Sequence, residues 1–165
     1  MLVPRRRIER TRSGEIRLRL PARERELLRT LPGQLRALLA EEDPSLARLF
    51  PPAYLDDSEA DAEYDRLVRD ELVSGKLRAL AIVEETAGAA RLDEEQLAAW
   101  IGALNDLRLV LGTRLGVTED MYTGFPNPRD PRAQELALFG YLTWLQEQAV
   151  QVLADALPEP GDGAL

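Results

Sequence analysis

The chain has 165 residues, of which 45% are hydrophobic and 30% charged, and its formal net charge is −8. This is the composition of an ordinary soluble, folded protein. The sequence contains neither cysteine nor histidine. That excludes disulfides, thiolate metal sites, cysteine nucleophiles and any catalytic or metal site built on histidine.

The charge is distributed unevenly along the chain. Residues 1–36 hold 11 arginines and 4 glutamates, a net charge of +7, whereas residues 37–165 carry −15. An acidic body repels anionic membranes and nucleic acid. We therefore expect neither to bind, since only the arginine-rich N-terminal arm could contact them. No segment has the apolar length of a signal peptide or a membrane span, so we expect a cytoplasmic protein.

The first twenty residues alternate between apolar and polar side chains, which is typical of β-strands. The apolar positions are Ile8, Ile16, Leu18 and Leu20. We predict strands near 5–11 and 15–20, joined as a β-hairpin by a turn that contains Gly14. A two-stranded ribbon is marginal by itself, so it should lie on the helices or pair with another chain. The second arrangement would give a homodimer through the hairpin edge.

After the hairpin the apolar spacing becomes helical, and we predict four main helices. Their ranges are 22–41, 58–87, 94–115 and 131–157. Pro32 and Gly33 predict a kink or a break in the first helix. Asp93 and Gln96 frame the start of the third, and Gly116 ends it. The chain is therefore expected to be mainly α: an antiparallel helical bundle of about four helices with an N-terminal β-hairpin.

We predict a single helical domain over residues 1–157. The hairpin occupies 1–20 and the bundle 21–157, and a disordered tail follows at 158–165.

The predicted helix 58–87 has an apolar stripe whose members follow one another at steps of three or four residues, and we expect this stripe to face the core. Its members are Tyr64, Val68, Leu72, Gly75, Ala79 and Ile82. Carboxylates crowd the run 56–71, but the run lacks the glycine and the ligand spacing of a calcium loop. Acids at a helix N-terminus are favoured by the helix dipole, so we predict no metal site there.

Polar residues interrupt the apolar face of the third predicted helix. On a helical wheel Arg108 falls inside the apolar arc, Asn105 flanks the arc and Asp106 points away from it. A guanidinium cannot lose its proton in the core, so we expect Arg108 to pair with Glu71 or Asp65 of the preceding helix. The alternative is that Arg108, Asn105 and Glu71 line a pocket for an anionic ligand.

A long loop over residues 116–130 carries three large apolar side chains among glycines and prolines. They are Met121, Tyr122 and Phe125. Loops of this kind are often binding elements, although they also plug the ends of bundles. We expect this loop, or the stretch Phe50–Tyr54, to contact a protein partner.

Four stretches of the sequence resemble one protein family. They are RLFPPAY at 48–54, EYDRL at 63–67, WIGALNDLRLVLGTRLG at 100–116 and LFGYLTWLQ at 138–146. Together they resemble an uncharacterised actinobacterial family that carries a "domain of unknown function" label, over nearly the whole chain. Members are often encoded beside the adaptor that feeds substrates to the Clp protease. The resemblance therefore implies a cytoplasmic protein connected with regulated proteolysis, and it supplies no catalytic residues.

We thus predict a non-enzymatic protein-interaction or regulatory protein, without cofactor or metal, whose partners include components of the Clp protease. Tyr122, Phe125 and Met121 are the predicted partner contacts. The alternative is a small-molecule binding protein, with an anion site around Arg108 and Asn105.

Overall fold

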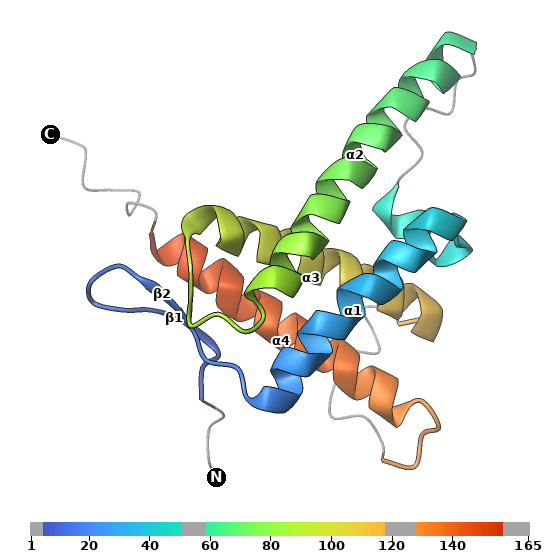
Figure 1. Cartoon of the computed structure of the whole chain (residues 1–165). Helices are drawn as coiled ribbons and strands as arrows, with labels where there is room; N and C mark the ends of the chain where they lie inside the picture. Colours follow the sequence, from blue (N-terminus) through green and yellow to red (C-terminus); the bar gives the residue numbers. More distant parts are fainter. Residues whose placement is uncertain (1–4, 51–58, 118–127, 157–165) are drawn as a thin grey trace, which may run out of the picture.

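The computed structural model describes residues 5–50, 59–117 and 128–156, and in these ranges the chain is mainly helical (Figure 1). The elements in chain order are β1 (Ile8–Arg10), β2 (Ile16–Leu18), α1 (Ala22–Glu41), the 3₁₀ helix η1 (Pro44–Leu49), α2 (Glu59–Thr86), β3 (Arg91–Leu92), α3 (Glu94–Leu115) and α4 (Ala133–Asp155). The predicted class, mainly α with an N-terminal hairpin, is confirmed. The predicted tail at 158–165 lies outside the described residues.

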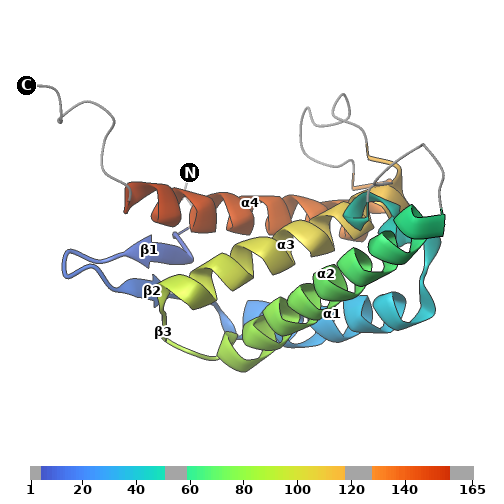
Figure 2. The same ribbon diagram turned by 90° about the horizontal axis from the view of Figure 1, so that it is seen from above.

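Helix α3 is the centre of the fold, with α4 on one side of it and α2 on the other (Figure 2). Trp100 of α3 has no exposed surface, and its Nε1 donates a hydrogen bond to Oγ1 of Thr86 at 2.7 Å. The apolar seam of α4 is buried against this centre, at Leu142, Leu145, Ala149 and Val152. None of the helices in the described ranges combines the length and hydrophobicity that crossing a bilayer requires.

Two of the predicted helix boundaries follow from local signals, whereas the break that was one of the two alternatives predicted at Pro32 does not occur. α3 begins and ends as predicted, because Asp93 and Gln96 form a capping box and Gly116 adopts a left-handed conformation with φ 65°. In contrast, α1 runs unbroken through Pro32, which is buried. The leucine face of α1 is packed into the core, and this burial offsets the hydrogen bond that proline cannot donate.

The hairpin forms as predicted and acquires a third strand. Ile8 lies opposite Leu18, all the predicted apolar positions are buried, and Gly14 takes a positive φ of 89° in the turn. β3 then pairs antiparallel with β2, which gives the order β1-β2-β3. The sequence did not reveal β3, because a two-residue strand is too short to show alternation.

Helix α4 covers the outer edge of β1. The side-chain Oε1 of Gln148 accepts hydrogen bonds from the backbone N–H groups of Arg7 at 2.6 Å and Ile8 at 3.2 Å. Arg10 donates from its side chain to the carbonyl oxygen of Val152 at 3.4 Å. Backbone donors that would invite another strand are thus occupied within the chain. The hairpin therefore lies on the helices, and we do not place a homodimer at this edge.

Candidate functional site

Helix α2 has two apolar faces, and only one of them is buried in the core. Leu80 and Val83, on the first face, have no exposed surface. The predicted stripe is on the second face, where no member is fully buried and Tyr64 is 60% exposed. The prediction that this stripe faces the core is wrong for Tyr64 and Leu72, which are exposed, whereas Ala79 and Ile82 are half-buried and pack against the core. The buried face lies roughly 90° further around the helix, given 100° per residue.

The first half of α2 extends beyond the rest of the bundle (Figure 1). In this part no described side chain is fully buried, and large apolar groups face solvent. Leu67 is 63% exposed and Leu72 is 45% exposed. A contiguous set of large apolar side chains on a surface commonly marks a binding site.

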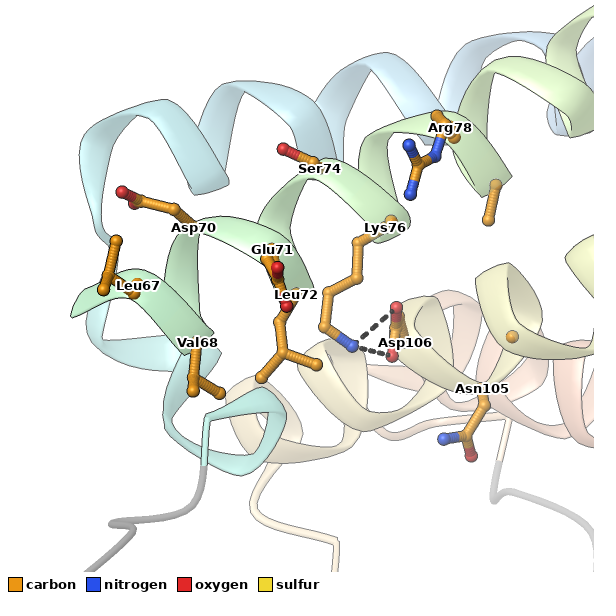
Figure 3. A pocket seen from close by; sticks show the side chains of 13 residues that line it. Leu67, Val68, Asp70, Glu71, Leu72, Ser74, Lys76, Arg78, Asn105 and Asp106 are labelled. Carbon is orange, nitrogen blue, oxygen red and sulfur yellow. Dashed lines mark hydrogen bonds and ion pairs between the residues drawn. The ribbon is translucent and has the colours of Figure 1, made fainter. Parts of the chain in front are cut away.

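A groove of about 1070 Å³ runs between α2 and α3 beside this exposed segment (Figure 3). Apolar side chains line its α2 side, at Leu67, Val68, Leu72 and Ala79. Its α3 side carries Gly102, Asn105 and Asp106. A Cβ atom added at Gly102 would meet nothing within 4 Å, so the groove is open at this point. The apolar stripe of α2 is thus one wall of a groove.

An ion pair between α2 and α3 lies at this groove. Lys76, the only lysine in the chain, donates from Nζ to both carboxylate oxygens of Asp106 at 3.1 Å (Figure 3). Asp106 is only 6% exposed. Burial raises the pKa of the Asp106 carboxyl, and the Lys76 ammonium offsets part of that rise. The Lys76 ammonium thus neutralises the Asp106 carboxylate, which is the most deeply buried charged group of the groove.

This pair was not among the sequence predictions, and the interpretation of Asp106 as pointing away from the buried side of its helix is wrong, since the residue is buried. A wheel drawn for one helix assigns one buried side, whereas α3 packs against α2, α4 and η1. A signal for Lys76 was present in the sequence. It lies four residues before Leu80, which is typical of a position on the same side of α2 as the buried face.

Arg108 does not form the predicted ion pair. Its Nη2 donates to Oδ1 of Asn105 at 3.2 Å, and the same oxygen accepts from Gln146 at 3.4 Å. Among the described residues, Arg108 has no carboxylate within ion-pair distance, and its Nε is buried without a hydrogen-bond partner. Glu71 is exposed in the groove, whereas Asp65 is half-buried with an unpartnered oxygen. The charged α2 side chain that pairs with α3 is Lys76, at Asp106, and neither acid takes the predicted place.

The structure brings some of the predicted site residues together. Asn105 and Glu71 both line the groove, while Arg108 is connected to it through Asn105. Phe50 is a contact within the chain: the Arg69 guanidinium lies 4.5 Å from its ring centroid and the Lys76 ammonium 5.9 Å. Four other predicted contacts lie outside the described residues. They are Tyr54, Met121, Tyr122 and Phe125.

The groove offers a surface on which another molecule can bind. Its one buried carboxylate is held by Lys76, and that ammonium is occupied in return. Within the described residues, no three acidic side chains converge as metal ligands would. What the groove offers is an open apolar wall next to an exposed helix face, and such a surface can receive apolar side chains of another molecule.

Comparison with known proteins gives a family for this chain. The family described as "Domain of unknown function (DUF2017)" matches residues 5–153. Proteins named "Oxidative stress regulator AosR" from Mycobacterium tuberculosis and Mycobacterium bovis are 34% identical over 128 residues, covering 67% of this chain and 58% of theirs. A "Putative oxidative stress regulator AosR" from Mycobacterium leprae is 32% identical over 129 residues, covering 68% and 59%.

The chain therefore spans somewhat more than half the length of these mycobacterial relatives. No solved structure matches it. The resemblance to an uncharacterised actinobacterial family is confirmed, because the match extends over nearly all of the sequence and the relatives are actinobacterial. The chain belongs to the family of domains of unknown function designated DUF2017.

Proposed function

We propose that this chain is a non-enzymatic regulatory protein that acts by binding protein through α2 and the adjoining groove. The observation that carries the proposal is the second apolar face of α2, with Tyr64 and Leu72 exposed on it beside an open groove that Leu67 also lines. The mycobacterial relatives are named as regulators, which supports a regulatory role. The occupied Lys76–Asp106 pair supports binding over chemistry.

Regulation here works through protein contacts rather than through a thiol switch within these residues. The relatives' name refers to oxidative stress, but the 165 residues contain no cysteine. Thiols are the usual reversible redox sensors of proteins. We propose that this chain is intracellular and that its regulated partner belongs to Clp-dependent proteolysis. This finer assignment is supported only by the family resemblance.

The first expected result concerns capture of a protein from a mycobacterial lysate by the tagged chain. Leu72→Glu puts a charge into the exposed α2 face and should reduce the captured partner at least about tenfold, the effect of about 1.4 kcal/mol. Quantitative mass spectrometry measures the loss. Leu153→Glu is the matched control, because Leu153 is an exposed leucine on α4, and it should leave capture unchanged.

Two results would contradict this proposal. One is equal capture by the Leu72→Glu variant and the wild type at unchanged melting temperature. The other is that only a Tyr122→Ala/Phe125→Ala variant loses capture, which would move the contact surface to the predicted loop.

A second function is favoured by one observation: the Nε of Arg108 is buried and has no hydrogen-bond partner. An anionic ligand at Arg108 and Asn105 would supply the missing acceptor. If this is the function, inorganic phosphate should raise the melting temperature of the wild type by several degrees and leave an Arg108→Met variant unshifted. Differential scanning fluorimetry measures the melting temperature of both proteins with and without phosphate. An equal shift in the wild type and in the Arg108→Met variant rules the anion site out.

A further inference from the structure

We infer that the arginine-rich hairpin is a second interaction site, which binds a short acidic segment of another protein. The site is separate from α2 and its groove, so the inference goes beyond the proposed function. Two features of the described residues carry it. One is a group of arginines without carboxylate partners around β1 and β2, and the other is the acidic surface that borders the hairpin.

The positive charge of the chain is concentrated at the hairpin. Residues 5–25 hold nine arginines and three glutamates, a net charge of +6, in a chain whose total is −8. The strands β1 and β2 have three residues each and are about 10 Å long at 3.4 Å per residue. The excess charge is therefore confined to a small part of the surface, where it attracts anionic groups.

Some of these arginines hold the hairpin in place. Arg7 donates from Nε to Glu24 of α1 at 3.0 Å, and Arg10 pairs with Glu94 of α3 at 2.8 Å. These guanidiniums are occupied within the chain. They attach the hairpin to the helices and leave the remaining arginines to account for the excess charge.

Five further arginines have no carboxylate partner in the ranges that the structure describes. They lie before β1, in the turn, on β2 and in the first turn of α1, at Arg5, Arg6, Arg12, Arg17 and Arg23. Arg17 is half-buried and the other four are exposed. The planar guanidinium presents its N–H donors in a fork that matches a carboxylate. These five side chains can therefore bind carboxylates of another molecule.

Arg17 occupies the middle of the outer face of the sheet. Ile16 and Leu18, its neighbours along β2, are buried, so Arg17 points away from the core. In the register of the sheet it lies opposite Glu9 of β1 on one side and opposite Arg91 of β3 on the other.

Neither neighbour gives Arg17 a counter-charge of its own. Glu9 pairs with Arg19 at 3.3 Å, and Arg91 pairs with Glu15 at 3.0 Å. Like charges directly opposite each other destabilise a sheet, and Arg17 and Arg91 are such a pair. A carboxylate from another molecule, placed between them, removes this repulsion.

The borders of the hairpin favour a short acidic segment over nucleic acid. Exposed acids lie on the elements next to it, with Glu147 and Asp155 on α4 and Glu95 at the start of α3. A duplex carries one negative charge for about every 1.7 Å of its length and would extend past the hairpin to these carboxylates. Residues 5–25 also contain no aromatic side chain on which bases could stack.

The position of the hairpin makes it accessible. Its turn extends beyond the ends of the helices (Figures 1 and 2). A partner segment can thus reach Arg12, in the turn, and Arg17 without displacing a helix. An acidic segment of a few residues ends before it meets the acids that border the hairpin.

Fluorescence polarisation of labelled peptides with the full chain tests the site. The probe is a peptide of about ten residues in which glutamate alternates with serine, and the control peptide has glutamine in place of each glutamate. We expect the glutamate peptide alone to bind, and its binding to weaken as salt is added. Equal binding of the two peptides, or no binding of either, overturns the inference.

Charge reversals locate the contact. Arg12→Glu and Arg17→Glu should each raise the dissociation constant of the glutamate peptide several-fold, and the double variant should raise it at least about tenfold. Arg12 lies outside the strands, so its replacement leaves the pairing of the sheet intact. Melting temperatures from circular dichroism show whether each variant is folded.

Arg48→Glu is the matched control. Arg48 is exposed on η1, at the opposite end of the molecule from the hairpin, and has no carboxylate partner within the described residues (Figure 1). The variant changes the net charge as much as Arg17→Glu does and should leave peptide binding unchanged at physiological salt. Equal weakening by the two variants would assign the attraction to the charge of the whole molecule and overturn the site.

Two other occupants would give different results. A DNA duplex of about 20 base pairs that binds more tightly than the peptide, and is lost in the double variant, would make the hairpin a nucleic-acid site. Self-association of the wild type that is lost in the double variant, as measured by sedimentation equilibrium, would assign the hairpin to a second copy of the chain. Either result overturns the inference.

The outcomes also separate this inference from the proposed function. If Leu72→Glu loses capture from the lysate and the wild type does not bind the glutamate peptide, the inference fails and the proposed function stands. If the wild type binds the peptide through Arg12 and Arg17 while Leu72→Glu captures as much protein as the wild type, the inference stands and the proposed function fails.

Discussion

Replacing Lys76 by methionine is expected to lower the free energy of unfolding by about 3–5 kcal/mol at neutral pH, the usual effect of breaking a buried ion pair. Methionine keeps the apolar length of the side chain but leaves the carboxylate of Asp106 without its counter-charge. Since the Asp106 side chain is only 9% exposed, water cannot replace the ammonium. Urea unfolding followed by circular dichroism measures the difference.

Two further variants show whether the unpaired charge is the cause. Asp106→Asn should cost less than Lys76→Met, because the Lys76 side chain is 19% exposed and can turn its ammonium toward water. The double variant Lys76→Met/Asp106→Leu should recover most of the stability, as buried pairs replaced by apolar groups often do. A double variant as unstable as Lys76→Met would mean that packing, rather than charge, is responsible.

The same pair predicts a pH dependence with a definite sign. Burial raises the pKa of Asp106 above its ordinary value of 3.8, so the native state binds this proton more tightly than the unfolded chain does. Between the ordinary and the raised pKa, stability therefore falls as pH rises. Removing Lys76 raises the pKa of Asp106 further. The deficit of Lys76→Met should thus shrink between neutral pH and about pH 5, and a deficit that grows on acidification would contradict the assignment.

Local signals in the sequence predict the elements of this fold well. The alternation of apolar residues predicts the hairpin, and the capping box with Gly116 predicts both ends of α3. Of the kink or break predicted at Pro32, the break does not occur, because the local preference of proline is outweighed by burial of the leucine face of α1. Such burial depends on the neighbouring helices and cannot be read from one segment.

The candidate site could be predicted only in part, for a related reason. The sequence shows that α2 carries an apolar stripe, but the structure decides that Leu80 and Val83 face the core while the stripe lines a groove. Which charges meet is decided by the register between helices. A shift of one turn would place Leu72 or Leu80 opposite Asp106 in place of Lys76 and leave the carboxylate without a counter-charge. Amphipathic patterns identify faces, and only packing identifies which face remains free.

The second large effect is expected at Gln148, whose side-chain oxygen accepts the backbone N–H groups of Arg7 and Ile8. Gln148→Met keeps the volume but removes the acceptor, so two donors at the covered edge of β1 lose their partner. Each buried orphan donor costs about 1–3 kcal/mol. The Nε2 of Gln148 is itself unpartnered, and its removal offsets part of this cost. We expect a net loss of about 2 kcal/mol in the free energy of unfolding.

Amide hydrogen exchange locates that loss. In Gln148→Met the amides of Arg7 and Ile8 should exchange faster, while those in the middle of α3 change only with global stability. Gln148→Glu is the matched control, because its carboxylate still accepts both N–H groups and should preserve their protection. If both variants leave the Arg7 and Ile8 amides as protected as in the wild type, the hairpin is held on α4 by its buried apolar face alone, and the glutamine is dispensable.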